Sequence, residues 1–389
     1  MIKKNVNESV IKMSEQFRNP ISENQYKKRL IPRREDVRGA FFRDHTAIIH
    51  SLPFRRLKHK AQVFFDPKND HVCTRIEHAL HVASIAATIC KGLGLNEQVA
   101  YAIGLAHDLG HPPFGHAGES ALKVKASSIG EFIHEVHGLR VVDILGNRGT
   151  SLNLTFIVRD GIICHCGENT DKELNPRKQI LDLAKIKDKG NIPCSYEGCV
   201  TRLSDKIAYL GRDLEDAIYG GFIKRRNIPP KIKEVLGETN GEIIDALVLD
   251  VIKTSKRKGT ISFSDEKYEL IKKLYDFSVE KIYNHKAILR YQTYCTKIVD
   301  QLFDYLKEIY DSYGNDYNRY KKSPVPLDGR FGNYLKKMKA VYRKKSNAKQ
   351  IVTDYIAGMT DGYALRCMRE ISLPEELSFE RKNVCCQAG

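Results

Sequence analysis

The stretch AHDLGHPPFGHAGE, residues 106–119, places three histidines and two acidic side chains among glycines and prolines. Apolar residues at helical spacing lead into it from Asn96, and Gly110 with the two prolines that follow predicts where this helix ends. His107 and Asp108 should therefore lie in the last helical turn, where an imidazole nitrogen and a carboxylate oxygen can bind one divalent ion. Candidates for the rest of the pocket are His111, His116 and Glu119.

Helical periodicity continues through most of the chain. The clearest helix is predicted for residues 74–91, with Thr74 as its N-cap, Glu77 completing a capping box and Leu80 in its apolar row. Further helices are expected at residues 131–145, 199–219, 242–253, 268–283, 288–310, 331–342 and 346–368. Since we find no internal repeat and no continuous series of strands, the protein should be all-α.

His78 lies on the otherwise apolar helix 74–91. A lone histidine in that position is usually a core residue with its hydrogen bonds satisfied. The adjacent His107 and Asp108 further along the chain change this interpretation, because a metal site needs more than two ligands. We therefore expect His78 to be a ligand.

The predicted helix 199–219 has a polar side beside its apolar one. Asp205, Tyr209 and Asp213 recur every four residues, so their side chains share one side of the helix. Such a row is often a solvated face. Because the metal site still lacks a ligand, we expect Asp205 to close it, with Lys206 next to it on the same wall.

Composition indicates a soluble globular protein. The 389 residues are 42% apolar and 29% charged, and no apolar run reaches the roughly 20 residues of a membrane span. The N-terminus lacks the apolar core of a secretion signal, so we expect a cytoplasmic protein without a membrane partner. The ten cysteines should then be reduced, and the spacing of Cys164, Cys166, Cys194 and Cys199 matches no standard zinc module, so plain thiols are favoured over structural zinc.

The formal net charge is +16, which fits anionic small molecules, nucleic acid or solubility alone. The basic residues are denser at residues 27–29, 253–258 and 336–345. Each group is either a solvated face or a contact to nucleic acid. Accessory nucleic-acid binding therefore stays open.

The order of His78, then His107–Asp108, then Asp205 resembles the HD superfamily of metal-dependent phosphohydrolases. Much more of the chain is similar to one branch, the dGTPase-type deoxynucleoside triphosphate triphosphohydrolases. The segments that carry this resemblance are residues 43–64, 75–78, 107–119, 203–216 and 354–361. It implies an HD-domain helical core at residues 36–225, preceded by a basic arm at 1–35 and followed by a helical region at 226–389 that completes the active-site cleft and makes oligomer contacts.

The resemblance assigns roles to individual residues. One divalent ion, magnesium, manganese or another transition metal, would be held by His78, His107, Asp108 and Asp205. The phosphate contacts would be Arg75 and Lys206, both cations where a triphosphate would arrive. The sugar 3′-hydroxyl would bind to Gln62 and Asp213, with Tyr209 against the sugar or phosphates and Val63 crowding a 2′-hydroxyl.

The family's catalytic pair matches His116 and Glu119, three residues apart, where the carboxylate can orient the imidazole and raise its pKa. A protonated His116 would then supply a proton to the departing 5′-oxygen. His111 and His134 match further pocket histidines that face phosphate oxygens, and we include His134 among the catalytic residues. The products would be a deoxynucleoside and inorganic triphosphate, and enzymes of this branch are usually homo-oligomers.

Two other functions remain open at this point. One is an HD-type phosphohydrolase or phosphodiesterase of another nucleotide, and the other is a nucleotide-sensing, nucleic-acid-binding protein. A second metal held by His134, His137 and His165 is disfavoured, because the chain lacks the adjacent histidine pair of binuclear HD phosphodiesterases. The sequence does not fix the preferred base, because recognition loops vary.

Overall fold

A computed structural model describes residues 16–64, 71–166 and 171–373. The prediction of an all-α protein is confirmed, because within these ranges the only strands are the short β1 (Glu173–Leu174) and β2 (Ile261–Ser262), paired antiparallel. The turn predicted at residues 66–70 lies outside the described residues. None of the described helices is both long and apolar enough to cross a membrane.

Three helices form the centre of the molecule: α5 (Arg75–Leu93), α6 (Glu97–Ala106) and α11 (Tyr196–Tyr219). The predicted capping box of Thr74 and Glu77 starts α5, and the left-handed Gly94 ends it with φ 72°. Asn96 then caps α6 through its side chain, so α5 and α6 are joined by a tight connection and pack against each other. The prediction that Leu80 belongs to the apolar row is wrong, because Leu80 is 42% exposed. The buried face of α5 is formed by other residues, among them Ala79, Val82, Ala86 and Ile89.

Shorter helices surround this centre on the N-terminal half of the chain. They are α2 (Glu23–Lys27), α3 (Gly39–Ile49), α4 (Leu52–Arg56), α7 (Gly115–Ala126), α8 (His134–Arg140), α9 (Gly146–Gly149) and α10 (Phe156–Ile163). A buried cluster of apolar side chains joins α3, α6, α8 and α10, and this cluster supports the turn that follows α6.

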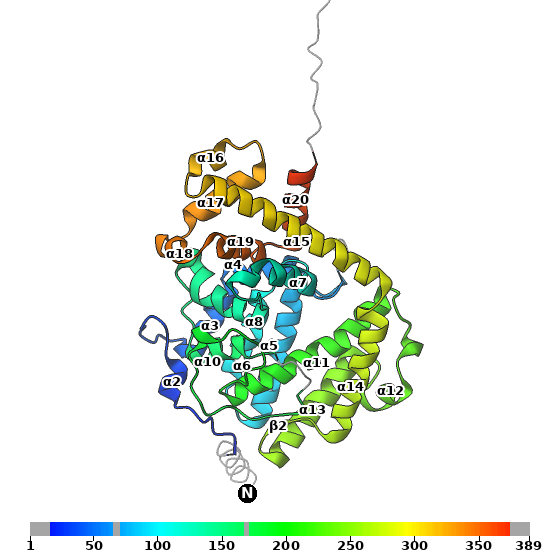
Figure 1. Cartoon of the computed structure of the whole chain (residues 1–389). Coiled ribbons are helices and arrows are strands. Elements are labelled where there is room, and N and C mark those ends of the chain that lie inside the picture. The colour runs from blue at the N-terminus through cyan, green and yellow to red at the C-terminus, as the bar shows by residue number, and fades with distance from the viewer. Residues whose placement is uncertain (1–15, 65–70, 167–170, 374–389) are drawn as a thin grey trace, which may run out of the picture.

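The C-terminal half adds two further groups of helices. They are α12 (Pro230–Leu236), α13 (Asn240–Lys258), α14 (Asp265–Ser278), α15 (Lys286–Tyr313), α16 (Tyr317–Lys322), α17 (Pro326–Lys337), α18 (Ala340–Lys345), α19 (Ala348–Ala357) and α20 (Asp361–Ser372). In Figure 1, α13 and α14 lie beside α11, while the long α15 crosses α7 and α19 at the opposite end. The second and third apolar clusters follow this division: one joins α5 and α11 to α13 and α14, and the other joins α7 to α15, α17, α19 and α20.

Several predicted helices are shorter or divided. Within 131–145, α8 begins only at His134 and is followed by a π-helical turn to Leu145, and another π-helical turn, Val279–Tyr283, follows α14. The pattern at 331–342 is split between α17 and α18, and that at 346–368 between α19 and α20. Apolar periodicity continues across each break, because both pieces pack on the same cluster, and it therefore hides the interruption.

The described part of the predicted N-terminal arm packs on the body of the protein. Phe17, Ile21 and Tyr26 are buried, and the Tyr26 hydroxyl donates to the Cys194 carbonyl at 3.0 Å. Residues 1–15 lie outside the described residues.

Candidate active site

The four predicted metal ligands lie together where α5, the end of α6 and α11 meet. The helix α6 ends at Ala106, so His107 and Asp108, predicted for its last turn, lie instead in the tighter 3₁₀ turn His107–Gly110 that follows it. His78 Nε2 lies 2.9 Å from Asp205 Oδ1. His107 Nε2 lies 3.8 Å from the same oxygen and 3.5 Å from Asp108 Oδ1. Two imidazoles and two carboxylates, drawn from three segments, therefore converge.

The orientation of His107 fits a metal ligand. Its Nδ1 lies 2.7 Å from the Gly104 carbonyl, and because a carbonyl oxygen only accepts, Nδ1 carries the proton. The lone pair on the buried Nε2 then points into the cluster, where it makes no hydrogen bond with any described residue. A donor set of two imidazole nitrogens and two carboxylate oxygens suits magnesium, manganese or another divalent transition metal.

Charges around this cluster are strongly coupled. Burial opposes protonation of His78, but its hydrogen bond with Asp205 and the charges of Asp205 and Asp108 together outweigh burial and raise the His78 pKa. Burial also disfavours the ionised Asp108, yet the charges of His107, His111 and Arg75 hold its pKa well below the usual range. Arg75 Nη1 donates to Asp108 Oδ2 at 2.6 Å, so the predicted phosphate contact is already fixed at the edge of the cluster.

Close packing of backbone explains the glycines in this turn. A Cβ on Gly110 would lie 2.0 Å from the His134 carbonyl oxygen, so only glycine lets α8 approach the His107–Gly110 turn. The chain then reverses through Phe114, whose φ of 65° is left-handed, before α7 begins.

Glu119, on α7, holds two histidines at once. Its Oε1 accepts from the backbone amide of His134 at 2.9 Å and lies 2.9 Å from His134 Nδ1. Its Oε2 lies 3.3 Å from His116 Nδ1, and the His116 side chain is 77% exposed. Burial works against the ionised carboxyl, but the His134 charge and the hydrogen bond with His116 hold the Glu119 pKa below its usual range. For His134, burial is likewise outweighed by the Glu119 charge together with the hydrogen bonds to Cys166 and Glu119, and its pKa is raised.

A cavity of about 370 Å³ opens beside these groups. The predicted site residues that line it are Gln62, Val63, Arg75, His78, Asp108, His111, His116, His134, Asp205, Tyr209 and Asp213. His107 and Glu119 lie behind this lining, and Lys206 is not part of it, although the charge of Asp205 acts on Lys206.

Sequence reasoning missed the wall that the C-terminal half contributes. This wall contains Tyr275, Tyr283, Tyr291 and Gln292. The Tyr283 hydroxyl donates to Asp213 Oδ2 at 2.6 Å, and burial raises the pKa of Asp213 to about 7. No signal in the sequence could have found these residues, because a tyrosine on an amphipathic helix is equally common in a packed core.

Asp361, at the start of α20, ties the C-terminal half to the site. Its two carboxylate oxygens accept from the backbone amides of Ala61 and Phe114, both at 2.8 Å. The neighbouring Lys60 is 3% exposed and donates from Nζ to the carbonyls of His111 at 2.5 Å and Ala357 at 2.9 Å. Three segments, residues 60–61, 111–114 and 357–361, are thereby joined to one another.

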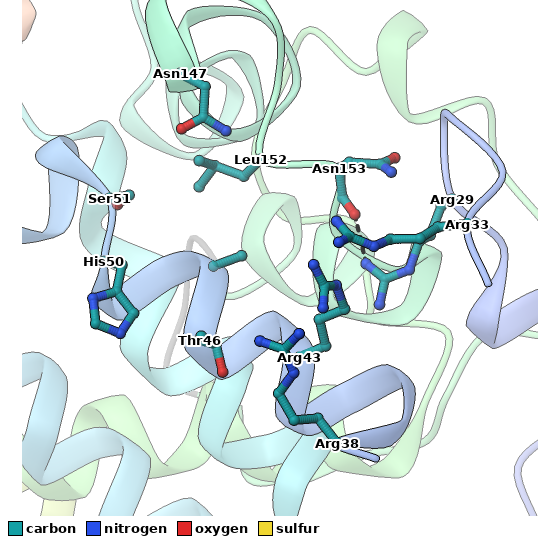
Figure 2. A pocket seen from close by; sticks show the side chains of 11 residues that line it. Arg29, Arg33, Arg38, Arg43, Thr46, His50, Ser51, Asn147, Leu152 and Asn153 are labelled. Carbon is teal, nitrogen blue, oxygen red and sulfur yellow. Dashed lines mark hydrogen bonds between the residues drawn. The ribbon is translucent and has the colours of Figure 1, made fainter. Parts of the chain in front are cut away.

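Another cavity, of about 290 Å³, is lined by residues of α3 and by the segments before and after it. Figure 2 shows Arg29, Arg33, Arg38 and Arg43 along one side of it, with His50 opposite. The lining contains no carboxylate, although Asp44 pairs with Arg29 at 2.6 Å, and Asp36 pairs with both Arg38 and Arg43. Because none of the possible metal-holding groups among the described residues lies here, we assign the chemistry to the cavity of about 370 Å³ beside the clustered ligands.

Comparison with known proteins agrees with the geometry. The family model of the HD domain matches residues 75–188, and that of the phosphohydrolase-associated domain matches residues 261–370. The first match contains three of the four clustered ligands, while Asp205 follows it in the chain.

Curated relatives cover most of the chain. One, from Caldanaerobacter subterraneus subsp. tengcongensis, is 39% identical over 87% of this chain and 86% of its own length. Others, from Desulfatibacillum aliphaticivorans and Clostridium tetani, are 36% and 34% identical over 87% and 88% of this chain, and 89% and 88% of their own lengths. Each of the three is called deoxyguanosinetriphosphate triphosphohydrolase-like protein.

Proposed function

Because this chain belongs to the HD-domain phosphohydrolases, among the deoxyguanosinetriphosphate triphosphohydrolase-like proteins, we propose that it hydrolyses deoxynucleoside triphosphates to deoxynucleosides and inorganic triphosphate. The main support is the convergence of His78, His107 and Asp205 at the edge of a cavity that also exposes Arg75. This cavity combines ligands for one divalent ion, a cation that can bind phosphates, and the separate pair of His116 and Glu119, which can donate a proton.

The ion would be held by His78, His107, Asp108 and Asp205. When bound, a divalent ion supplies Lewis-acid polarisation of a phosphate oxygen and lowers the pKa of a bound water. The chain's own contribution on this side is Arg75, which Asp108 holds in place through a 2.6 Å hydrogen bond, so that its remaining N–H groups can bind phosphate oxygens. Lys206, next to Asp205, adds a second positive charge.

Proton transfer to the departing 5′-oxygen is assigned to His116. Glu119 lies 3.3 Å from its Nδ1, which orients the ring and leaves Nε2 free to carry the proton outward. The high exposure of the His116 side chain fits a group that is covered only when the substrate is bound. His111 and His134, stacked at 3.8 Å between ring centroids, form the adjoining wall, which the phosphates would contact.

Recognition of the deoxyribose is assigned to the opposite wall of the cavity. Gln62 and Asp213 would bind the 3′-hydroxyl, with Tyr209 packed against the sugar. Val63 would occupy the space of a 2′-hydroxyl and so disfavour ribose. Tyr283 supports this arrangement, because its hydrogen bond fixes the Asp213 carboxylate.

The decisive experiment incubates the purified protein with each of the four dNTPs and with GTP, in magnesium or in manganese. Chromatography should detect a deoxynucleoside and intact triphosphate in equal amounts. Asp108→Ala and Asp205→Asn should lose at least about a hundredfold in rate while remaining folded, as a cooperative thermal unfolding transition would show. Release of a nucleoside monophosphate or of single phosphate would refute the proposed reaction and favour another nucleotide hydrolase of the HD type.

Partners of the protein remain proposals as well. We propose that the protein is a cytoplasmic homo-oligomer with accessory nucleic-acid binding, and the net charge of +16 supports the last of these. Binding to single-stranded DNA should weaken steeply with added salt if the basic groups contact phosphates, and a flat salt response would count against it.

A further inference from the structure

Next to the four-residue cluster lies a second group of potential metal ligands. His134 from α8, His165 after the end of α10 and Cys166 each offer one atom, and these three atoms lie within 4.8 Å of one another. The His165 and His107 rings are 5.0 Å apart between centroids, so the two groups are neighbours. The roles assigned above leave His165 and Cys166 unused.

His165 has the same local geometry as His107. Its Nδ1 lies 2.7 Å from the carbonyl of Ile162, so Nδ1 carries the proton and Nε2 holds a lone pair. The residue is 1% exposed, and Nε2 has no hydrogen-bond partner among the described residues. A buried acceptor without a partner costs about 1–3 kcal/mol, so this arrangement is expensive unless a ligand binds there.

The imidazole of His134 is oriented in the way that metal-binding histidines are. Glu119 Oε1 lies 2.9 Å from its Nδ1, and a carboxylate in this position fixes the tautomer that presents Nε2 to a metal. His134 Nε2 lies 3.8 Å from Cys166 Sγ, which is long for a hydrogen bond but suits two ligands that share one ion.

A thiol–imidazole contact alone explains less of this arrangement. It would pair Cys166 with His134 and still leave His165 Nε2 unsatisfied. Burial raises the pKa of the Cys166 thiol to about 12, so a thiolate there needs a nearby cation, and a bound transition metal deprotonates its thiol ligand.

We propose that His134, His165 and Cys166 hold a second ion, a thiolate-bound transition metal of the zinc class, beside the first. Two nitrogens and one sulfur favour zinc or cobalt over magnesium, and three protein ligands leave one position open. His134 and Cys166 line the 370 Å³ cavity while His165 lies behind them, so the open position faces the cavity. The phosphate contact assigned to His134 would then be made through this ion, with the thiol and imidazole protons released to solvent on binding.

The test uses cobalt, because a thiolate bound to Co²⁺ gives an intense near-ultraviolet charge-transfer band. The full chain, without added affinity histidines, is stripped by chelation, dialysed, and titrated with Co²⁺. We expect the wild type to bind about two ions per chain and to show this band. Cys166→Ser should bind about one ion and lack the band. The matched control is Cys164→Ser, which changes a fully buried thiol on the same segment and should keep both the band and the second ion.

Failure of this proposal is separable from failure of the proposed function. Asp205→Asn should lose the first ion and keep the charge-transfer band, whatever the substrate. One ion per chain in the wild type, or a band that persists in Cys166→Ser, would overturn the second site. Absence of dNTP hydrolysis with two ions bound would leave this site standing and refute only the reaction.

Discussion

Replacing Asp361 with alanine should disconnect the C-terminal helices from the active site. The substitution removes the acceptors of two backbone amides, those of Ala61 and Phe114, each now bonded at 2.8 Å. An unsatisfied buried donor costs about 1–3 kcal/mol, so we expect a total loss of about 2–6 kcal/mol in the free energy of unfolding. Asp361→Asn keeps one acceptor oxygen and should lose about half as much. Because Phe114 leads into α7, activity should fall with stability as His116 and Glu119 shift.

Hydrogen exchange followed by mass spectrometry locates this effect, and urea denaturation measures its size. The amides of Ala61 and Phe114 should exchange faster in Asp361→Ala. The matched control is Asp328→Asn, because Asp328 is also 1% exposed and accepts from Tyr305 and Ser323, but takes no part in lining the cavity. It should lose stability without changing exchange at Phe114. Unchanged exchange at both amides in Asp361→Ala, or a loss below about 0.5 kcal/mol, would refute the reasoning.

Three further predictions concern the cavity wall and the turn. Val63→Ala should raise kcat/KM for GTP relative to dGTP by about tenfold, measured by product chromatography, and an unchanged ratio would remove Val63 from sugar selection. For Asp213, whose pKa is raised to about 7, KM for dNTPs should fall as the pH rises through 7, because the carboxylate accepts the 3′-hydroxyl proton more strongly than the neutral acid does. Asp213→Asn should show no such change. Between pH 3.8, the ordinary pKa of an aspartate, and about pH 7, Asp213 is protonated in the folded state but ionised in the unfolded state. The free energy of unfolding should therefore decline as the pH rises through this window, relative to that of Asp213→Asn. Parallel pH profiles of the two proteins would contradict this. Gly110→Ala should lose about 3 kcal/mol and nearly all activity, because its Cβ would lie 2.0 Å from the His134 carbonyl oxygen, whereas Gly241→Ala, with no atom within 4 Å, should behave like wild type in thermal unfolding and rate.

The metal cluster could be predicted from the sequence because local patterns carry it. Helical spacing placed His78 on α5 and Asp205 on α11, and the run from His107 supplied two ligands at once. The capping box at Thr74 was equally local.

Long-range pairing could not be predicted in the same way. Ala61 and Asp361 are 300 residues apart, and nothing near either residue indicates the other. The position of the tyrosines in the cavity wall could not be predicted either. Periodicity shows that a helix has a buried side, but not whether that side faces the core or a cavity. The sequence indicates only a disfavoured second-metal ligand at His165 and a plain thiol at Cys166, because their proximity to His134 depends on how α8 and α10 pack.

The bonds of Asp361 have a consequence for how the protein is made. During synthesis, all four ligands of the first cluster leave the ribosome well before Asp361, whose carboxylate accepts from the amides of Ala61 and Phe114. A nascent or prematurely terminated chain would thus have a complete set of ion ligands, but the segment that carries His116 and Glu119 would not be held in place. A chain that ends before Asp361 should therefore bind an ion without carrying out the proposed hydrolysis.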